Sequence, residues 1–139
     1  MSLLTANEVN QIAFITPIDS ALILDEIIQV AETKFIIPAL PKPIYVDLSV
    51  HPGNYATLIV DYIKPYLAYC VKFLLYSQYF SDALLTSNLD KSREDIVNET
   101  NLLIKAKREL LVYHLSSGNY PLYSPPSKKL TAGFLVRRP

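Results

Sequence analysis

The residue types that carry out acid–base or nucleophilic chemistry are few in this sequence and do not have the spacing of catalytic motifs. Asp25-Glu26 and Glu94-Asp95 are pairs of neighbouring acids, but adjacent residues of a helix point in different directions, so each pair is expected on a solvated face. His51 and His114 lie far apart, and neither has a second ligand at a metal-binding spacing. The three glycines do not form a phosphate-binding loop. We therefore predict no catalytic residue, no metal site and no cofactor, and we expect a protein that is not an enzyme.

Cys70 is the only cysteine, so an internal disulfide and a cysteine zinc site are both excluded. It lies in the most apolar stretch of the chain and is expected to be a small buried hydrophobic residue. The N-terminal residues MSLLTANEV lack a basic segment followed by an apolar one, so we predict no signal peptide. Basic residues are too sparse to predict a dedicated nucleic-acid module.

Charge is unevenly distributed along a chain whose net charge is zero. Residues 119–139 hold four basic residues and no acid, whereas the first 118 residues hold nine basic and thirteen acidic residues, for a net charge of −4. A basic tail of this kind is either a solvated end or a segment that meets nucleic acid or an acidic protein face. Half of all residues are hydrophobic, which is typical of a protein with a partner surface in addition to its core.

The elements that position these residues are predicted to be helices, and the chain is organised around the stretch Tyr55–Phe80. This stretch is apolar on nearly every side and predicts a buried helix over residues 54–81. Pro65 lies inside it and is expected to kink or split the helix. Charges interrupt it, and the longest charge-free piece after Lys72 ends at Ser81, far short of the roughly 18 residues that a membrane span needs. We therefore predict no membrane-spanning helix. The many tyrosines of the stretch Tyr55–Phe80 are typical either of subunit contacts or of an ordinary core.

Three further helices are predicted on either side of this one. Thr5 and Glu8 form a capping-box pattern for a helix over residues 6–12. Thr16-Pro17 predicts a second start, with a helix over residues 18–35 that Pro38 ends. Residues 38–53 are expected to be a loop region in which 44–48 form a short strand or a helical turn. The fourth helix begins after Ser92 and stops at Gly118, with two apolar rows, Ile96/Leu103/Leu110 and Val97/Ile104/Leu111.

The predicted fold class is therefore all-α, a small bundle of about four helices over residues 1–118, followed by an extended C-terminal arm over residues 119–139. Residues 120–126 hold three prolines and cannot be helical, and residues 130–136 favour an extended segment. A lone strand has no partner in an all-helical body, so we expect it to pair with a neighbouring chain. The predicted interface residues are Tyr120, Tyr123, Phe134, Leu135, Val136, Arg137 and Arg138.

Three short motifs resemble those of small head–tail connector proteins of tailed phages, the type found in crAss-like and other Bacteroidales phages. Residues 31–40, AETKFIIPAL, resemble their AE-x-x-F/Y-I-x-P-x-L element, and residues 63–68, IKPYLA, resemble their central helix. Residues 113–115, followed by 119–123, NYPLY, are similar to their "YL…N…YPLY" close. The resemblance covers residues 3–123. Pro41 stands where many relatives have glycine, so the turn at that point is expected to differ.

This resemblance implies a structural protein of the virion neck or tail, assembled in the host cytoplasm. It implies a homo-oligomeric ring, commonly twelvefold, that joins the portal and capsid to the tail and contacts portal and other ring proteins. Double-stranded DNA would pass through the lumen without sequence readout, and no membrane would be involved. The C-terminal arm, residues 119–139, would then reach an adjacent subunit or the next ring.

Two alternatives stay open on the sequence. One is a helical scaffolding or regulatory protein that binds a single partner through a groove. The other is a peripheral membrane protein that uses the face of residues 66–80.

Overall fold

The computed structural model describes residues 3–14, 17–80 and 93–123, and these residues form an all-α fold in which no strand occurs. Its helices are α1 (Ala6–Ala13), α2 (Asp25–Ala31), α3 (Ile37–Ala39), α4 (Lys42–Val50), α5 (Lys64–Leu74) and α7 (Arg93–Leu115). Three π-helical segments, η2 (Glu32–Ile36), η4 (Leu58–Ile63) and η5 (Leu75–Tyr79), join some of these into longer helices, and η1 (Ser20–Leu22) and η3 (Pro52–Tyr55) are short 3₁₀ turns. The predicted all-α class is confirmed.

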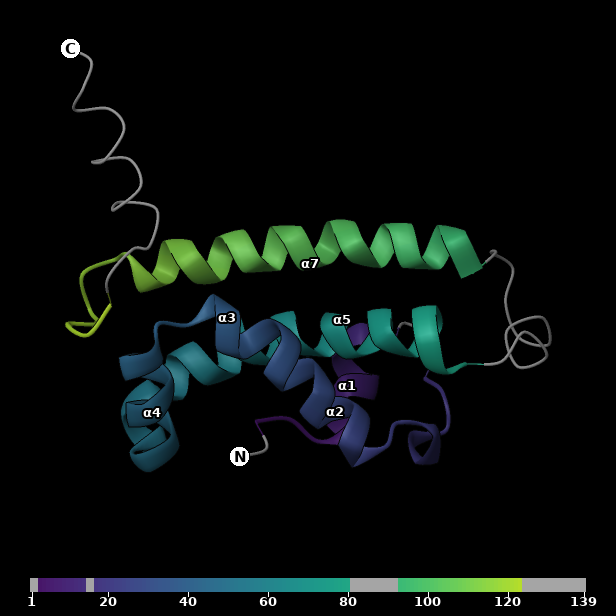
Figure 1. The fold of residues 1–139 in the computed structure, drawn as a ribbon, viewed down its shortest axis with the longest axis horizontal. Helices are drawn as coiled ribbons and strands as arrows, with labels where there is room; N and C mark the ends of the chain where they lie inside the picture. Colours follow the sequence, from purple (N-terminus) through teal and green to yellow (C-terminus); the bar gives the residue numbers. More distant parts are fainter. Residues whose placement is uncertain (1–2, 15–16, 81–92, 124–139) are drawn as a thin grey trace, which may run out of the picture.

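Helix α5 lies in the middle of the fold, with α7 antiparallel along one side and α1 and α2 on the other (Figure 1). Six of its eleven residues are buried, and Leu67, Cys70 and Leu74 are wholly inaccessible to solvent. An all-round apolar helix of this kind is stable only when protein covers every side. The predicted central buried helix, with Cys70 as an inert core residue, is therefore confirmed.

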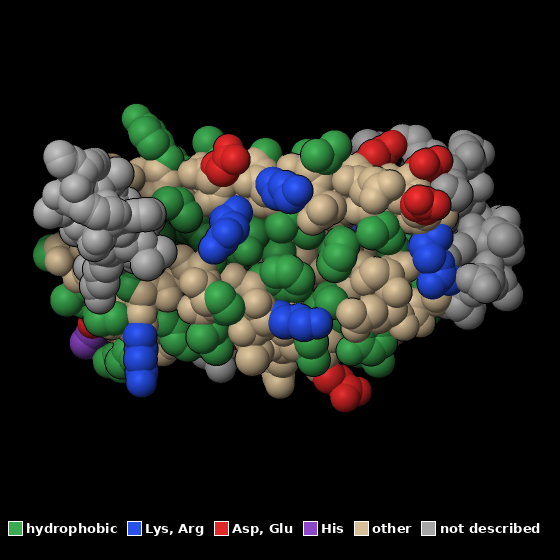
Figure 2. Space-filling model, turned by 45° about the horizontal axis from the view of Figure 1, so that its top comes forward, with side chains coloured by type: hydrophobic (Ala, Val, Ile, Leu, Met, Phe, Trp, Pro, Cys, Tyr) green, Lys and Arg blue, Asp and Glu red, His purple; other side chains and the backbone are tan. Residues whose placement is uncertain are grey.

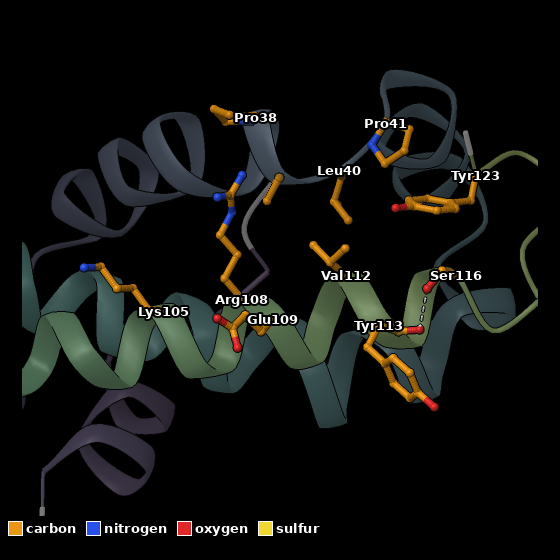
Figure 3. Close-up of a pocket in the computed structure, with 11 residues that line it drawn as sticks. Pro38, Leu40, Pro41, Lys105, Arg108, Glu109, Val112, Tyr113, Ser116 and Tyr123 are labelled. Carbon is orange, nitrogen blue, oxygen red and sulfur yellow. Dashed lines mark hydrogen bonds between the residues drawn. The ribbon is translucent and has the colours of Figure 1, made fainter. Parts of the chain in front are cut away.

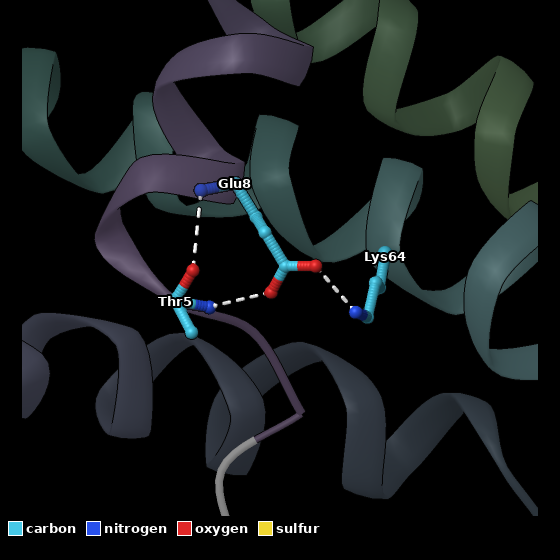
Figure 4. Close-up of polar contacts among 3 residues, drawn as sticks. All are labelled: Thr5, Glu8 and Lys64. Carbon is cyan, nitrogen blue, oxygen red and sulfur yellow. Dashed lines mark hydrogen bonds and ion pairs between the residues drawn. The ribbon is translucent and has the colours of Figure 1, made fainter.

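The first helix forms where its capping box predicts, and it is tied to the centre of the fold. The Glu8 backbone N–H donates to Thr5 Oγ1 at 3.2 Å, and the Thr5 N–H donates to Glu8 Oε1 at 3.0 Å. The Lys64 ammonium pairs with the other oxygen of Glu8 (Figure 4). Burial acts to raise the pKa of Glu8, but the bonds from Lys64 and Thr5 outweigh it and hold that pKa below its usual range.

The second helix starts later than predicted. Asp19 caps a short turn through its side chain, and the continuous helix begins only at Asp25, whereas Thr16, the predicted cap, lies outside the described residues. The Asn10 side chain explains this break, because its amide donates to the Ile18 carbonyl and its oxygen accepts from the Ile18 N–H at 2.9 Å. Asn10 thereby fixes the segment before η1 in a non-helical conformation.

Pro38 and Pro65 do not end or split the helices that contain them, so the predicted stop at Pro38 and the predicted split at Pro65 are wrong, whereas the other predicted outcome for Pro65, a kink, stays a prediction. Each follows a π-helical segment in which the residue before the proline bonds five residues back, Ile37 to Glu32 and Lys64 to Ile59. The wider π turn relieves the contact that a proline ring makes with the preceding turn of an α-helix. The second helix therefore continues to Ala39, and the central helix passes through Pro65 without splitting.

Residues 38–53 were predicted to be a loop region, and this is wrong for most of them. Residues 42–50 form α4, which has Pro43 in its first turn and buries Ile44 and Leu48 on one face. Four-residue spacing of two apolar side chains is the helical signal, so the helical alternative is correct. Tyr45 of α4 donates a 2.9 Å hydrogen bond to Glu32, a buried carboxylate that also accepts from the Leu3 N–H.

Candidate functional site

The first residues of the predicted C-terminal arm fold back onto the helical body. Gly118 ends the turn after α7 with φ of 98°, a conformation that favours glycine. Tyr120 then stacks on Tyr55 with ring centroids 6.0 Å apart, and its hydroxyl lies 2.7 Å from His114 Nε2. Tyr120 and Tyr123 both pack against the hydrophobic core. The described part of the arm, residues 119–123, is thus a strap held by ring contacts.

His114 connects this strap to the central helix. Its ring stacks on Tyr62 of η4 at 4.0 Å, nearly parallel, and meets Tyr120 edge-on at 5.3 Å. From the sequence, the position of His114 near a helix C-terminus predicts a residue that interacts with the helix dipole or lies on the surface, and this interpretation missed the cluster. The available signal was the proximity of His114 to Tyr120 across a glycine turn, but the partners Tyr55 and Tyr62 come from a distant part of the chain.

Tyr55 extends the same cluster to α4. Its hydroxyl bonds to Asp47, and this bond, with burial, raises the pKa of Tyr55 to about 12. The phenol therefore stays protonated and serves as a donor over the physiological range. We call Tyr55, Tyr62, His114 and Tyr120 the clamp, because their ring contacts and the two hydrogen bonds of Tyr55 and Tyr120 join α7, η4 and α4.

A groove lies beside the strap, between α7 and the turn from α3 to α4 (Figure 3). Its cavity volume is about 710 Å³. Leu40 and Val112 project into it from opposite walls, Tyr123 closes one end, and Arg108 and Lys105 line the other. An apolar floor with a few charges at the edge suits a short peptide or a side chain from a partner better than a small polar substrate.

The outward face of α7 carries hydrophobic side chains that no described residue covers. We call Leu102, Leu103, Ala106, Leu110 and Tyr113 the outer stripe. Leu102 is 66% exposed, Leu110 51% and Tyr113 79%. These residues recur at intervals of three and four, so they share one face of the helix. Hydrophobic side chains are spread along this edge of the molecule, several acids lie together near one end, and a further acid stands among the hydrophobic side chains toward the other end (Figure 2).

The burial pattern of α7 corrects the prediction from its sequence. The helix turns Ile96, Thr100, Ile104, Leu111 and Leu115 into the core, which leaves Leu103 and Leu110 of the first predicted row exposed. Apolar residues occupy more than one face of α7, and the contact with α5 determines which face is buried. The apolar residues that stay exposed form the outer stripe.

The described residues contain no candidate metal centre. Across residues 3–14, 17–80 and 93–123, no group of three or more His, Cys, Asp or Glu could hold a metal ion. Within the same ranges, none of the helices combines the length and the apolarity that crossing a bilayer requires. The Cys70 thiol is buried, and burial raises its pKa far above the usual range, so it is not a nucleophile at neutral pH.

The seven predicted interface residues fall into two groups. Tyr120 and Tyr123 lie in the strap, where they contact their own chain, and their role at an interface stays a prediction. Phe134, Leu135, Val136, Arg137 and Arg138 lie outside the described residues.

Comparison with known proteins adds no family to this picture. No family model, no curated protein and no solved structure matches the chain.

Proposed function

We propose that this chain is a structural subunit of an oligomeric ring, of the kind that joins the portal and capsid of a tailed phage to its tail. The proposal comes from the resemblance of residues 3–123 to small connector proteins. One observation supports it physically, which is the outer stripe of α7. Large side chains that are half to four-fifths exposed along one helix face are typical of a surface that another protein covers.

The proposed role is mechanical. The long helices centred on α5 and α7 would act as a rigid wedge, and side-to-side contacts between copies would close the ring, with twelvefold symmetry as the expectation. DNA would pass through the lumen without sequence readout. Acidic residues on such a lumen would repel phosphate and ease passage, whereas basic residues would hold the DNA. The ring would stand in the neck of the virion, beside portal and other ring proteins.

The test is the mass of the native particle. The purified chain, alone and mixed with the portal protein from the same genome, is analysed by native mass spectrometry and negative-stain microscopy. We expect a closed ring of defined copy number, alone or on the portal. A chain that stays monomeric in both samples overturns the proposal.

The second candidate is a helical scaffolding or regulatory protein that binds one partner. The groove between Leu40 and Val112 favours it, since a closed apolar floor beside Arg108 suits a single inserted peptide. A defined one-to-one complex, with substitution of Val112 by glutamate abolishing it and no ring at any concentration, would support this second candidate.

A further inference from the structure

An acidic pair, Asp95 and Glu99, lies next to the outer stripe of α7, toward the N-terminal end of the helix. Asp95 and Glu99 precede Leu102 and Ala106 at intervals of four, three and four, so these four residues lie on one face of the helix. Asp95 and Glu99 stand in the first two turns of α7, and the exposed leucines and Tyr113 follow toward its C-terminal end, with one further exposed acid, Glu109, between Ala106 and Tyr113 on the same face. An occupant that fits this face is apolar along its length and basic at one end.

The C-terminal segment of the chain has this composition in this order. Phe134-Leu135-Val136 is followed directly by Arg137-Arg138, and no acid occurs in residues 119–139. An antiparallel path along α7 would bring the apolar triplet onto the leucines and the arginines to the acids. Asp95 and Glu99 also have partners in their own chain. They retain capacity for arginine, because the two oxygens of a carboxylate accept about four hydrogen bonds.

The dimensions agree as well. The midpoint of Asp95 and Glu99 lies about seven residues before the midpoint of Leu102 and Ala106, which is about 10 Å along the helix at 1.5 Å per residue. In an extended segment, the middle of the arginine pair lies about 8 Å from Leu135 at 3.3 Å per residue. Both groups therefore meet their counterparts in a single register.

From this match we infer that residues 134–138 of one copy lie antiparallel on the outer stripe of α7 of a neighbouring copy. The inference rests on the proposed ring function and names the contact that would close it. A donor segment and an acceptor face at different places on one chain form a heterologous contact, and repetition of such a contact generates a ring when the rotation between copies closes. A segment that closed on its own α7 would consume the acceptor face and leave no contact for the next copy.

The test is disulfide trapping between two variants of the full chain. One variant carries Leu102→Cys and the other Val136→Cys, and the native Cys70 stays because it is wholly buried. The two are mixed, oxidised gently and separated without reductant. We expect a cross-linked pair at least tenfold more abundant than in the control mixture, in which Val50→Cys replaces Leu102→Cys. Val50 lies on α4 and has nearly the same exposure, 64% against 66%.

Three results would overturn the inference. The first is equal cross-linking of Val136→Cys to the α4 control. The second is a dominant pair between two Leu102→Cys chains, which would mean that the stripe meets a second α7. The third is a double variant that forms only an internal disulfide at a concentration where the unmodified chain assembles. If the unmodified chain forms a ring, any of these results refutes the contact between residues 134–138 and α7 but leaves the proposed ring function standing. If the unmodified chain forms no ring, both the contact and the ring function are refuted.

A charge variant gives an independent readout. Arg137→Glu with Arg138→Glu in the donor should reduce the cross-linked yield about fivefold, which is the effect expected of two partly exposed ion pairs. Replacement by lysine at both positions keeps the charge and should preserve most of the yield. Equal yields from the glutamate and lysine variants would contradict an acidic partner for the arginines.

Discussion

Replacement of Leu102 by glutamate tests whether the outer stripe serves association and not the stability of the monomer. Leu102 is 66% exposed in the described fold, so its side chain contributes little to the core. Leucine and glutamate have nearly equal helix propensity. We therefore expect the free energy of unfolding to change by no more than about 0.5 kcal/mol.

The effect on association should be much larger. Burying a whole leucine side chain is worth about 1.5–3 kcal/mol, so covering the exposed two-thirds of Leu102 is worth about 1–2 kcal/mol. In the inferred register Val136 covers this position, and Asp95 and Glu99 pair with the neighbouring arginines, so a carboxylate here must be desolvated against an apolar side chain, which adds at least about 2 kcal/mol. A total of about 3 kcal/mol weakens each contact by more than a hundredfold.

Sedimentation velocity over a concentration series measures the association, and denaturant unfolding measures the stability. Val46→Glu is the matched control, because Val46 lies inside α4 and is also half exposed, at 51%. We expect the control to assemble as the unmodified chain does. If Leu102→Glu associates as strongly as the unmodified chain, the reasoning is refuted. A decrease of more than about 2 kcal/mol in the free energy of unfolding would also refute it, because Leu102 would then belong to the core.

Three further predictions concern the body and the strap. Leu111→Ala removes a side chain with no exposure and should lower the free energy of unfolding by about 2–4 kcal/mol in denaturant titration, whereas Leu110→Ala, on the exposed side, should cost less than about 1 kcal/mol. Gly118→Ala should destabilise the chain by about 1 kcal/mol because φ is positive there, whereas Gly53→Ala, with open space and no positive φ, should be tolerated; thermal unfolding of both variants checks the contrast. Because the folded chain raises the pKa of Tyr55 to about 12 from about 10 in the unfolded chain, its contribution is complete below pH 10 and is lost as the pH rises toward 12. Tyr55→Phe should therefore show a shallower fall in unfolding free energy between pH 10 and 12, and a slope equal to that of the unmodified chain would contradict this assignment.

The helices themselves were largely predictable, because their signals are local. The capping box of Thr5 and Glu8, the apolar stretch around α5 and the stop at Gly118 each act within a few residues. The wrong predictions of helix boundaries have two causes, a contact with a side chain of another helix and local π turns. Asn10 determines the late start of the second helix, and π turns, which no simple periodicity reveals, allow Pro38 and Pro65 inside helices.

The candidate site was less predictable for the same reason. The composition predicted exposed apolar surface but not its location, because the face of α7 that is buried depends on how the helix packs against α5. The contact between His114 and Tyr120 spans only six residues, but Tyr62, which stacks on His114, lies more than fifty positions earlier in the chain, and no local spacing predicts that contact.

The most direct test of the central claim is the native mass of the unmodified chain as its concentration is raised, alone and with its cognate portal protein. The account predicts one discrete particle of fixed copy number, whose formation Leu102→Glu prevents. A single 15.7 kDa species throughout both series would contradict it.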